Sequence, residues 1–420
     1  MQSYPHPTKG SAIDRPEHWR DEFGEAVTAA DAASVAVWRA AYDEMLRFTG
    51  DPLTRLDAVN RTDASFVIGP VFTLTARLLG GVDRADPAVV ADVVRLHSRI
   101  DGATDRERGH AEAALLLHAG EFLAAAARWD DVSVRHPGDL TAARFVHDVC
   151  LHIGDDTIRL PSARRAVQVW PVGSRAHGLA NGMLAFALEE TGHAEEAERC
   201  GRVALEHDDA DMWARHALAH VYESQARHDT ALELLVPSSA HWSTQNMLSG
   251  HLWWHVGIRL LHHGAIDDAI DVLDERLTSR TAFGLADSTS LLWRLALNGA
   301  AVDGRWGDLA DAWAANSQRH TCGFLDLHAA LAFAAVPTHR GADPFWSGVP
   351  ASHAAGDTFN DLTFRRVVTP MVSGLRAFGE GDTAGAVDAL ESVTVDLARI
   401  GGSVLQRDVV GETLAVARSR

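Results

Sequence analysis

Residues 176–211, AHGLANGMLAFALEETGHAEEAERCGRVALEHDDAD, decide the fold of this chain. Apolar residues recur at spacings of three and four in both halves of this segment, which predicts two amphipathic helices. Between the helices, Gly192 allows a tight turn, and Ala197, five residues later, lets the two helices approach closely. The segment therefore predicts one antiparallel helix pair of about 34 residues.

The same signature recurs along the chain as a Gly followed five residues later by an Ala, inside helical flanks. It occurs at Gly120 and Ala125, Gly192 and Ala197, Gly264 and Ala269, and Gly381 and Ala386. Alternating β-branched runs are scarce, and helix-favouring residues dominate. The pattern resembles the tetratricopeptide repeat, and it predicts an all-α, right-handed solenoid of helix pairs.

The organisation along the chain follows from the repeats. We expect an N-terminal helical region with degenerate repeats at residues 1–100, central repeats at residues 101–334 and a C-terminal helical repeat at residues 358–420. Residues 58–75 look irregular. Residues 335–357 are rich in Pro, Gly and small polar residues, which predicts a long loop. Because this segment carries Phe345 and Trp346, we interpret it as a cover over a site.

Composition limits the possible partners. The formal net charge of −19 argues against nucleic-acid binding and against anionic membrane surfaces. Cys150, Cys200 and Cys322 are too far apart for a disulfide framework or a thiolate zinc site. There is neither a signal-peptide pattern nor an apolar run of about 18 residues, so we expect a soluble, cytoplasmic protein.

Two pairs of histidines stand out among the 23 in the chain. In MWARHALAHVYE, His216 and His220 are four residues apart and Glu223 is three further on, so all three share one helix face. In GHLWWHVG, His251 and His255 have the same spacing. The two helices belong to consecutive repeats, so we expect their equivalent faces to lie side by side.

The histidine pairs are offset from the stripe that packs each helix against its neighbours. In repeats of this kind the offset positions line a concave groove. His216, His220 and Glu223 match groove positions, as do His251 and Trp254 in the next repeat, and His255 lies beside the packing stripe. The sequence therefore predicts imidazoles, a carboxylate and an indole facing a shared hollow.

Three chemical interpretations remain open for this constellation. Imidazoles at positions i and i+4 can chelate a divalent metal, with His216, His220, His251 and His255 as the candidate ligands. Alternatively, they can support metal-free acid–base chemistry or recognise a polar substrate, because imidazole titrates near neutrality. In the third interpretation they pack and hydrogen-bond within the helices and support a peptide-binding groove.

Further candidates lie downstream in ADSTSLLWRL and GFLDLHAALAF. Asp287 is most simply a helix N-cap, and Arg294, seven residues later, shares its face. Asp326 and His328 are two residues apart and therefore point to different helix faces.

The stretches HALAHVYE, HLWWH, DSTSLLWRL, FLDLH and GGSVLQRD, in this order and spacing, resemble the tetratricopeptide-repeat protein 38 family. The resemblance covers most of the chain from about Asp101 onward and implies a helical-repeat fold throughout. It marks a set of positions without implying a reaction: His216, His220, Glu223, His251, Trp254, His255, Asp287, Arg294, Phe324, Asp326, His328, Arg407 and Asp408.

The functional hypothesis from sequence is an enzyme or binder: a pocket that binds a small polar organic molecule and, if it is an enzyme, transforms it by histidine acid–base chemistry. The expected catalytic residues are His216, His220, Glu223, His251, His255, Asp287 and His328. The expected substrate-binding residues are Trp254, Arg294, Phe324 and Asp326. The alternatives are an adaptor that binds a peptide or protein partner in the groove, and a histidine-ligated, metal-dependent hydrolase whose cofactor is a divalent metal.

Overall fold

The computed structural model describes residues 19–243, 247–316 and 320–420 of the chain. Within them, helices form nearly all of the regular structure, and the strands β1 (Trp19–Arg20) and β2 (Ala26–Val27) form one short antiparallel pair. The α-helices are α1 (Ala32–Arg47), α2 (Pro52–Thr62), α3 (Ile68–Leu79), α4 (Pro87–Arg99), α5 (Asp105–His118), α6 (Phe122–Arg135), α7 (Leu140–Ile153), α8 (Asp156–Val169), α9 (Arg175–Glu189), α10 (Ala194–His207), α11 (Met212–Ser224), α12 (His228–Leu235), α13 (Ser239–Trp242), α14 (Met247–His262), α15 (Ile266–Arg276), α16 (Ala282–Leu297), α17 (Trp306–Asn316), α18 (Gly323–Ala335), α19 (Ala342–Ser352), α20 (Phe359–Thr363), α21 (Thr369–Glu380), α22 (Thr383–Glu391) and α23 (Val404–Ser419). The described residues also form the 3₁₀ turns η1 (Ile100–Gly102), η2 (Asp303–Arg305) and η5 (Leu397–Ile400) and a π-helical segment, η4 (Phe364–Val368).

The helices pack as antiparallel pairs, which confirms the predicted all-α stack. The pairs α5/α6, α9/α10, α14/α15 and α21/α22 turn at the four predicted glycines, all of which have positive φ. Positive φ strains residues with a Cβ, so glycine suits these turns. The four paired alanines, at positions 125, 197, 269 and 386, are fully buried between the helices.

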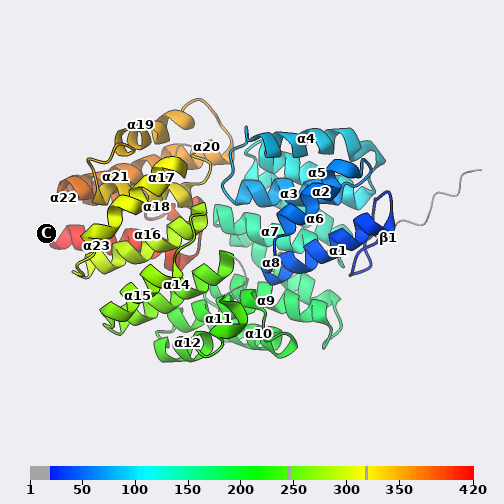
Figure 1. Ribbon diagram of the computed structural model, residues 1–420, viewed down its shortest axis with the longest axis horizontal. Helices are drawn as coiled ribbons and strands as arrows, with labels where there is room; N and C mark the ends of the chain where they lie inside the picture. The colour runs from blue at the N-terminus through cyan, green and yellow to red at the C-terminus, as the bar shows by residue number, and fades with distance from the viewer. Residues whose placement is uncertain (1–18, 244–246, 317–319) are drawn as a thin grey trace, which may run out of the picture.

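The chain wraps around so that its first and last thirds lie side by side (Figure 1). The Thr321 hydroxyl lies 3.4 Å from the carbonyl oxygen of Gly81, across this seam. Farther along, the backbone N–H of Val404 donates to the Glu190 carboxylate at 3.2 Å and so joins α23 to the end of α9. A large apolar core includes buried residues from Val27 to Ala417. A second, smaller apolar cluster packs between the helices α8 to α12.

Two sequence-based expectations about local structure are wrong. Residues 335–357 are not a long loop, because they contain the helix α19. Phe345 is buried against Phe333, with a ring-centroid distance of 5.1 Å, and this apolar contact outweighs the weak helix propensity of a segment with Pro and Gly. Likewise, the segment expected to be irregular at residues 58–75 contains the end of α2 and most of α3.

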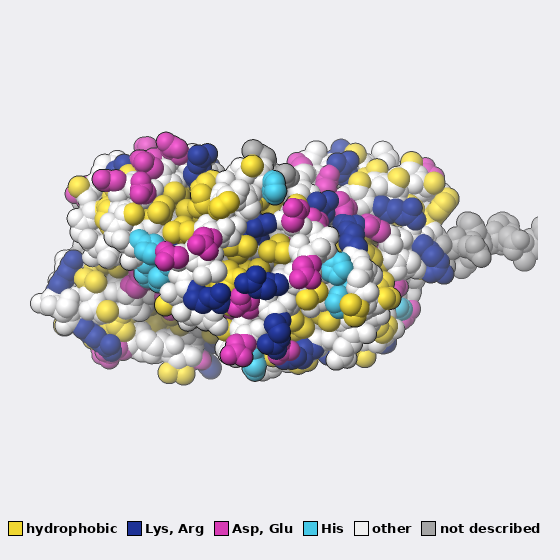
Figure 2. All heavy atoms as spheres, turned by 90° about the horizontal axis from the view of Figure 1, so that it is seen from below, with side chains coloured by type: hydrophobic (Ala, Val, Ile, Leu, Met, Phe, Trp, Pro, Cys, Tyr) yellow, Lys and Arg dark blue, Asp and Glu magenta, His cyan; other side chains and the backbone are white. Residues whose placement is uncertain are grey.

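Among the described residues, no helix combines the length and the hydrophobicity needed to cross a lipid bilayer. On the face shown in Figure 2, basic and acidic side chains are mixed in small groups among hydrophobic ones. This face therefore lacks the continuous basic track that typically binds nucleic acid.

Candidate histidine centre

Two neighbouring helices carry the histidine pairs. The side chain of Asp211 caps α11 by accepting from the backbone N–H of Ala214, which stabilises the first turn of this helix. His216 and His220 follow one turn apart on α11, and His251 and His255 have the same spacing on α14. All four side chains are buried, with residue exposures of 4%, 2%, 9% and 0%, respectively.

The four imidazoles converge on one another. The Nε2 atom of His216 lies 2.9 Å from Nε2 of His220 and 3.1 Å from Nε2 of His251. The ring of His255 completes the group, with centroid distances of 4.6 Å to His220 and 4.8 Å to His251. One nitrogen from each of the four residues can be chosen so that all four lie within 4.8 Å of one another. We call His216, His220, His251 and His255 the histidine centre.

Two carboxylates approach the histidine centre from outside. Oδ1 of Asp287, on α16, lies 2.8 Å from Nδ1 of His251. Oε2 of Glu189, at the end of α9, lies 3.8 Å from Nδ1 of His220, beyond hydrogen-bonding distance. Helices from four consecutive repeats therefore contribute to this region.

Several buried polar atoms at the histidine centre have no hydrogen-bond partner among the described residues. These atoms are Nδ1 of His216 and both ring nitrogens of His255. Buried polar atoms in folded proteins are nearly always paired, so unpaired ones call for an explanation.

Burial determines the charge state of these imidazoles. Desolvation lowers the pKa of His216, His220 and His255 well below the usual value, and the neighbouring imidazoles lower it further. All three rings are therefore neutral at pH 7, which is the form that binds metals. Burial, together with the charge of Glu190, also raises the pKa of Glu189 to about 8.

Aromatic rings fix the orientation of the imidazoles. Trp254 stacks on His251 at a centroid distance of 5.1 Å and an interplanar angle of 11°. On the other side, Phe186 stacks on His216 at 5.2 Å, and Trp213 packs against the same ring at 4.9 Å. Trp254 thus forms a wall, as expected, but it faces the histidine centre rather than an open groove.

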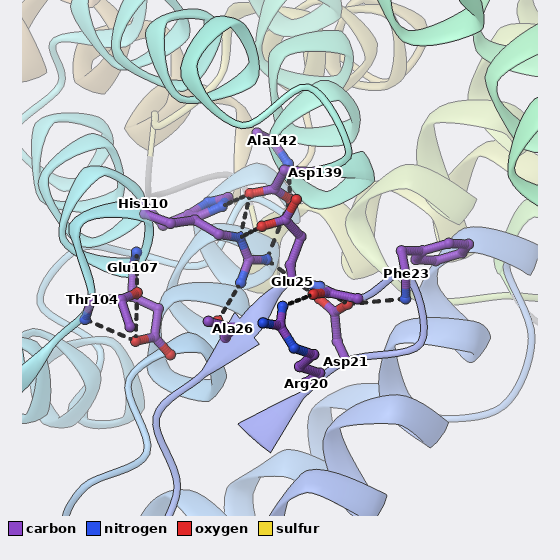
Figure 3. A network of polar contacts seen from close by, with 12 residues as sticks. Arg20, Asp21, Phe23, Glu25, Ala26, Thr104, Glu107, His110, Asp139 and Ala142 are labelled. Atoms are coloured by element: carbon purple, nitrogen blue, oxygen red, sulfur yellow. Dashed lines mark hydrogen bonds and ion pairs between the residues drawn. The ribbon is translucent and has the colours of Figure 1, made fainter. Parts of the chain in front are cut away.

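The buried His110 provides a contrast. Its Nε2 lies 2.7 Å from Asp139 (Figure 3). Trp129 donates its indole N–H to His110 Nδ1 at 3.0 Å. Arg106 binds the same Asp139 carboxylate at 2.7 Å, and its charge holds the pKa of Asp139 well below the usual range despite the opposing effect of burial. Both nitrogens of His110 are paired, so this network is typical of a structural core, whereas the histidine centre is not.

Other predicted site residues lie away from the histidine centre. Glu223 forms an ion pair with Arg259 and lies 3.3 Å from Nε2 of His262. Arg294 binds Glu412 at 2.9 Å and the carbonyl oxygen of Leu405 at 3.0 Å, which ties α16 to α23. Neither side chain therefore contributes to the imidazole group.

The three predicted residues of α18 form separate contacts. His328 Nδ1 donates to the carbonyl oxygen of Phe324 at 2.8 Å, and the Phe324 ring packs on the imidazole at 4.5 Å. Burial lowers the pKa of His328 to about 4. Asp326 instead faces His320, whose Nδ1 lies 2.8 Å from Oδ1 of Asp326. These residues form local packing and hydrogen bonds of α18, away from the four imidazoles.

Three cavities of the described structure lie along the seam between the two ends of the chain. One has a volume of about 120 Å³ and includes His320, His353 and Asp361 in its wall. A second, of about 240 Å³, includes His320 and Asp326. A third, smaller cavity borders the same seam at Thr321. No histidine of the histidine centre lines any of these three; its rings face one another instead.

Sequence reasoning missed two residues near the histidine centre. Glu189 lies in the run LEETG, which gave no sign that its carboxylate would approach His220. His147, on α7, is buried against Trp213 with a ring-centroid distance of 5.2 Å. Both lie on other helices than the histidine pairs, so no local spacing pattern connects them with these pairs.

Comparison with solved structures finds low sequence similarity. The crystal structure of a Rap protein complexed with competence and sporulation factor is 14% identical, with a TM-score of 0.43 over 76% of this chain and 96% of that chain. The P58(IPK) TPR domain is also 14% identical, with a TM-score of 0.21 over 75% of this chain and 99% of that chain. No family model matches the chain. The fold therefore rests on the helix pairs themselves, and the resemblance to the tetratricopeptide-repeat protein 38 family stays a prediction.

Proposed function

We propose that this helical-repeat protein is a metal-binding protein in which the histidine centre holds one divalent transition-metal ion. The observation that carries the proposal is the convergence of the Nε2 atoms of His216, His220 and His251 at 2.9 and 3.1 Å. Imidazole nitrogens are good ligands for zinc, copper, iron and nickel.

A count of protons supports an ion between these rings. The carboxylate of Asp287 only accepts hydrogen bonds, so Nδ1 of His251 carries a proton, and in the neutral form of this imidazole Nε2 presents a lone pair. His216 Nε2 then faces Nε2 atoms of two other imidazoles and has at most one proton to share between them when neutral. A cation accepts all of these lone pairs at once, which removes the conflict.

The spacing of the nitrogens is compatible with zinc. Zinc binds imidazole nitrogen at about 2.0–2.1 Å in tetrahedral sites, which places neighbouring ligand atoms about 3.3 Å apart. The two shortest contacts are near this spacing, and the widest separation, within 4.8 Å, needs only a modest closure of the group. Four histidines would complete a tetrahedral shell, as in structural zinc sites, and would join α11 to α14.

The other hypotheses have less support. Acid–base chemistry on a small polar molecule needs access and an ionisable imidazole, whereas the rings are buried and desolvation lowers the pKa of His216, His220 and His255. A metal-dependent hydrolase needs an open coordination position for water, and four histidine ligands would leave none. A peptide adaptor would place these imidazoles on an open groove, whereas the four side chains of the histidine centre are buried.

The direct test is metal stoichiometry of the full chain. Protein stripped with a chelator is dialysed against one to two equivalents of zinc, passed over a desalting column and analysed by mass spectrometry of the metal. We expect one equivalent in the wild type and much less than half an equivalent in His216→Ala and His251→Ala.

A matched control excludes surface binding. His262 lies on the same helix as His251, stacks on His228 at 4.8 Å and has a side chain that is 49% exposed, so His262→Ala should retain the full equivalent. Zinc absent from the wild type, or retained equally by the two centre variants, would contradict the proposal.

A further inference from the structure

Asp287 is a buried carboxylate in the middle of a helix. The N-cap of α16 is Thr281, whose hydroxyl accepts from the backbone N–H of Gly284 at 3.2 Å. The sequence-based interpretation of Asp287 as an N-cap is therefore wrong, because the helix begins earlier than its apolar pattern suggested. Asp287 is only 6% exposed, and a carboxylate at such a position needs a partner.

That partner is His251. Oδ1 of Asp287 lies 2.8 Å from His251 Nδ1, in the next repeat back along the chain. The cation nearest in sequence on the same face, Arg294, instead binds Ser290, Glu412 and the Leu405 carbonyl. The carboxylate thus faces the imidazole rather than neutralising the guanidinium of its own helix.

This contact decides which nitrogen of His251 faces the centre. With the proton held on Nδ1 by the carboxylate, the lone pair is on Nε2, which points at His216 Nε2 at 3.1 Å. The stacked indole of Trp254 holds the plane of the ring. Tautomer and orientation are thereby fixed together, as in the carboxylate–histidine–metal arrangements of known metal sites.

We propose that Asp287 is the positioning residue of the metal site: it keeps the Nδ1 proton of His251 and presents Nε2 to the ion. This inference rests on the proposed function. The site then extends over three consecutive repeats, with ligands on α11 and α14 and the positioning carboxylate on α16.

Glu189 provides an internal comparison. Its Oε2 is 3.8 Å from His220 Nδ1, too far for a hydrogen bond. The geometry therefore assigns Asp287 the larger effect on the ion. Asp326 provides an external comparison, because it is also buried and its Oδ1 is also 2.8 Å from a histidine nitrogen, Nδ1 of His320, but it does not contact the histidine centre.

The experiment measures zinc affinity by competition with a chromophoric chelator in wild type, Asp287→Ala, Asp287→Asn, Glu189→Gln and Asp326→Asn. Loss of such an outer carboxylate typically weakens metal binding 10–100-fold, and we expect this for Asp287→Ala. Asp287→Asn should lose less, because the amide oxygen still accepts from Nδ1. Glu189→Gln and Asp326→Asn should stay within about threefold of wild type.

A spectroscopic measurement separates positioning from a general loss of structure. Cobalt(II) in the site of the wild type should give the intense visible bands of a tetrahedral ion, and Asp287→Ala should shift or weaken them at saturating metal, while Asp326→Asn leaves them unchanged. If Asp287→Ala fails to fold, Asp287→Asn carries the test.

The outcomes distinguish the two proposals. A wild type that binds no metal would overturn the proposed function itself. A wild type that binds one equivalent, with unchanged affinity and spectrum in both Asp287 variants, would overturn the positioning role alone, as would equal losses in the Asp287 and Asp326 variants.

Discussion

Replacement of His255 by leucine should separate a metal ligand from a packing residue. His255 is fully buried and neither ring nitrogen has a hydrogen-bond partner among the described residues. Leaving buried polar groups unpaired costs about 1–3 kcal/mol. Leucine has a similar volume and no polar atom, so His255→Leu removes this cost in the metal-free protein.

The replacement also removes favourable ring contacts. The imidazole packs against His220 at 4.6 Å and against Trp254 at 4.9 Å, and aromatic pairs contribute about 0.5–1.5 kcal/mol beyond their buried area. The balance predicts that metal-free His255→Leu is as stable as the wild type or up to about 2 kcal/mol more stable. Most substitutions of a buried residue instead lower the stability of the protein.

In the presence of zinc, the wild type should be more stable than His255→Leu. A ligand at 100 times its dissociation constant stabilises the folded state by about 2.7 kcal/mol, and the variant should lose most of this gain. The assay is urea unfolding followed by circular dichroism, for both proteins, with a chelator and with zinc. A contrary result would combine two observations. In the presence of chelator, His255→Leu would be less stable than the wild type by more than about 1 kcal/mol, and zinc would stabilise the variant as much as the wild type.

Two further predictions concern pH and the closure of the chain. Burial lowers the pKa of His328 from 6.5 to about 4, so the unfolded state binds a proton that the folded state lacks as the pH falls through 6.5. The titration of His328 alone should lower the free energy of unfolding by about 2 kcal/mol between pH 7.5 and pH 5. Chemical unfolding at both pH values should show a smaller decrease in this free energy for His328→Gln than for the wild type. An equal decrease in the two proteins would contradict the lowered pKa of His328. Gly154 has a φ of +61° and a Cβ there would meet the carbonyl oxygen of Ala398, so Gly154→Ala should destabilise by about 2 kcal/mol or more and increase hydrogen exchange in α23. Gly411→Ala, in open space on α23, is the control and should be neutral or slightly stabilising in thermal unfolding.

The fold was largely predictable because local signals agree. Gly192 and Ala197 mark the turn and the close approach within one helix pair, and the same two residue types recur in three other pairs. Each signal acts within about ten residues and depends on backbone geometry alone. The helix α19 was not predictable in this way, because it is stabilised by the packing of Phe345 on Phe333 of another helix, α18.

The candidate site was only partly predictable. The spacing of His216 and His220, and of His251 and His255, correctly indicated that each pair shares a helix face. The spacing could not show whether that face points into the protein or toward a groove. The imidazole rings are buried in the interior. Glu223, one turn from His220, forms an ion pair with Arg259 and does not join the histidine centre. The partner of His251 was also hidden, because it lies 36 residues away on another helix.

A single ion between the four imidazoles would be visible in diffraction data collected from zinc-loaded crystals above and below the zinc absorption edge. We expect one strong anomalous peak at about 2.0–2.1 Å from one nitrogen each of His216, His220, His251 and His255. A well-ordered structure with no peak there, or with zinc only at surface histidines such as His228 and His262, would contradict the proposed metal site.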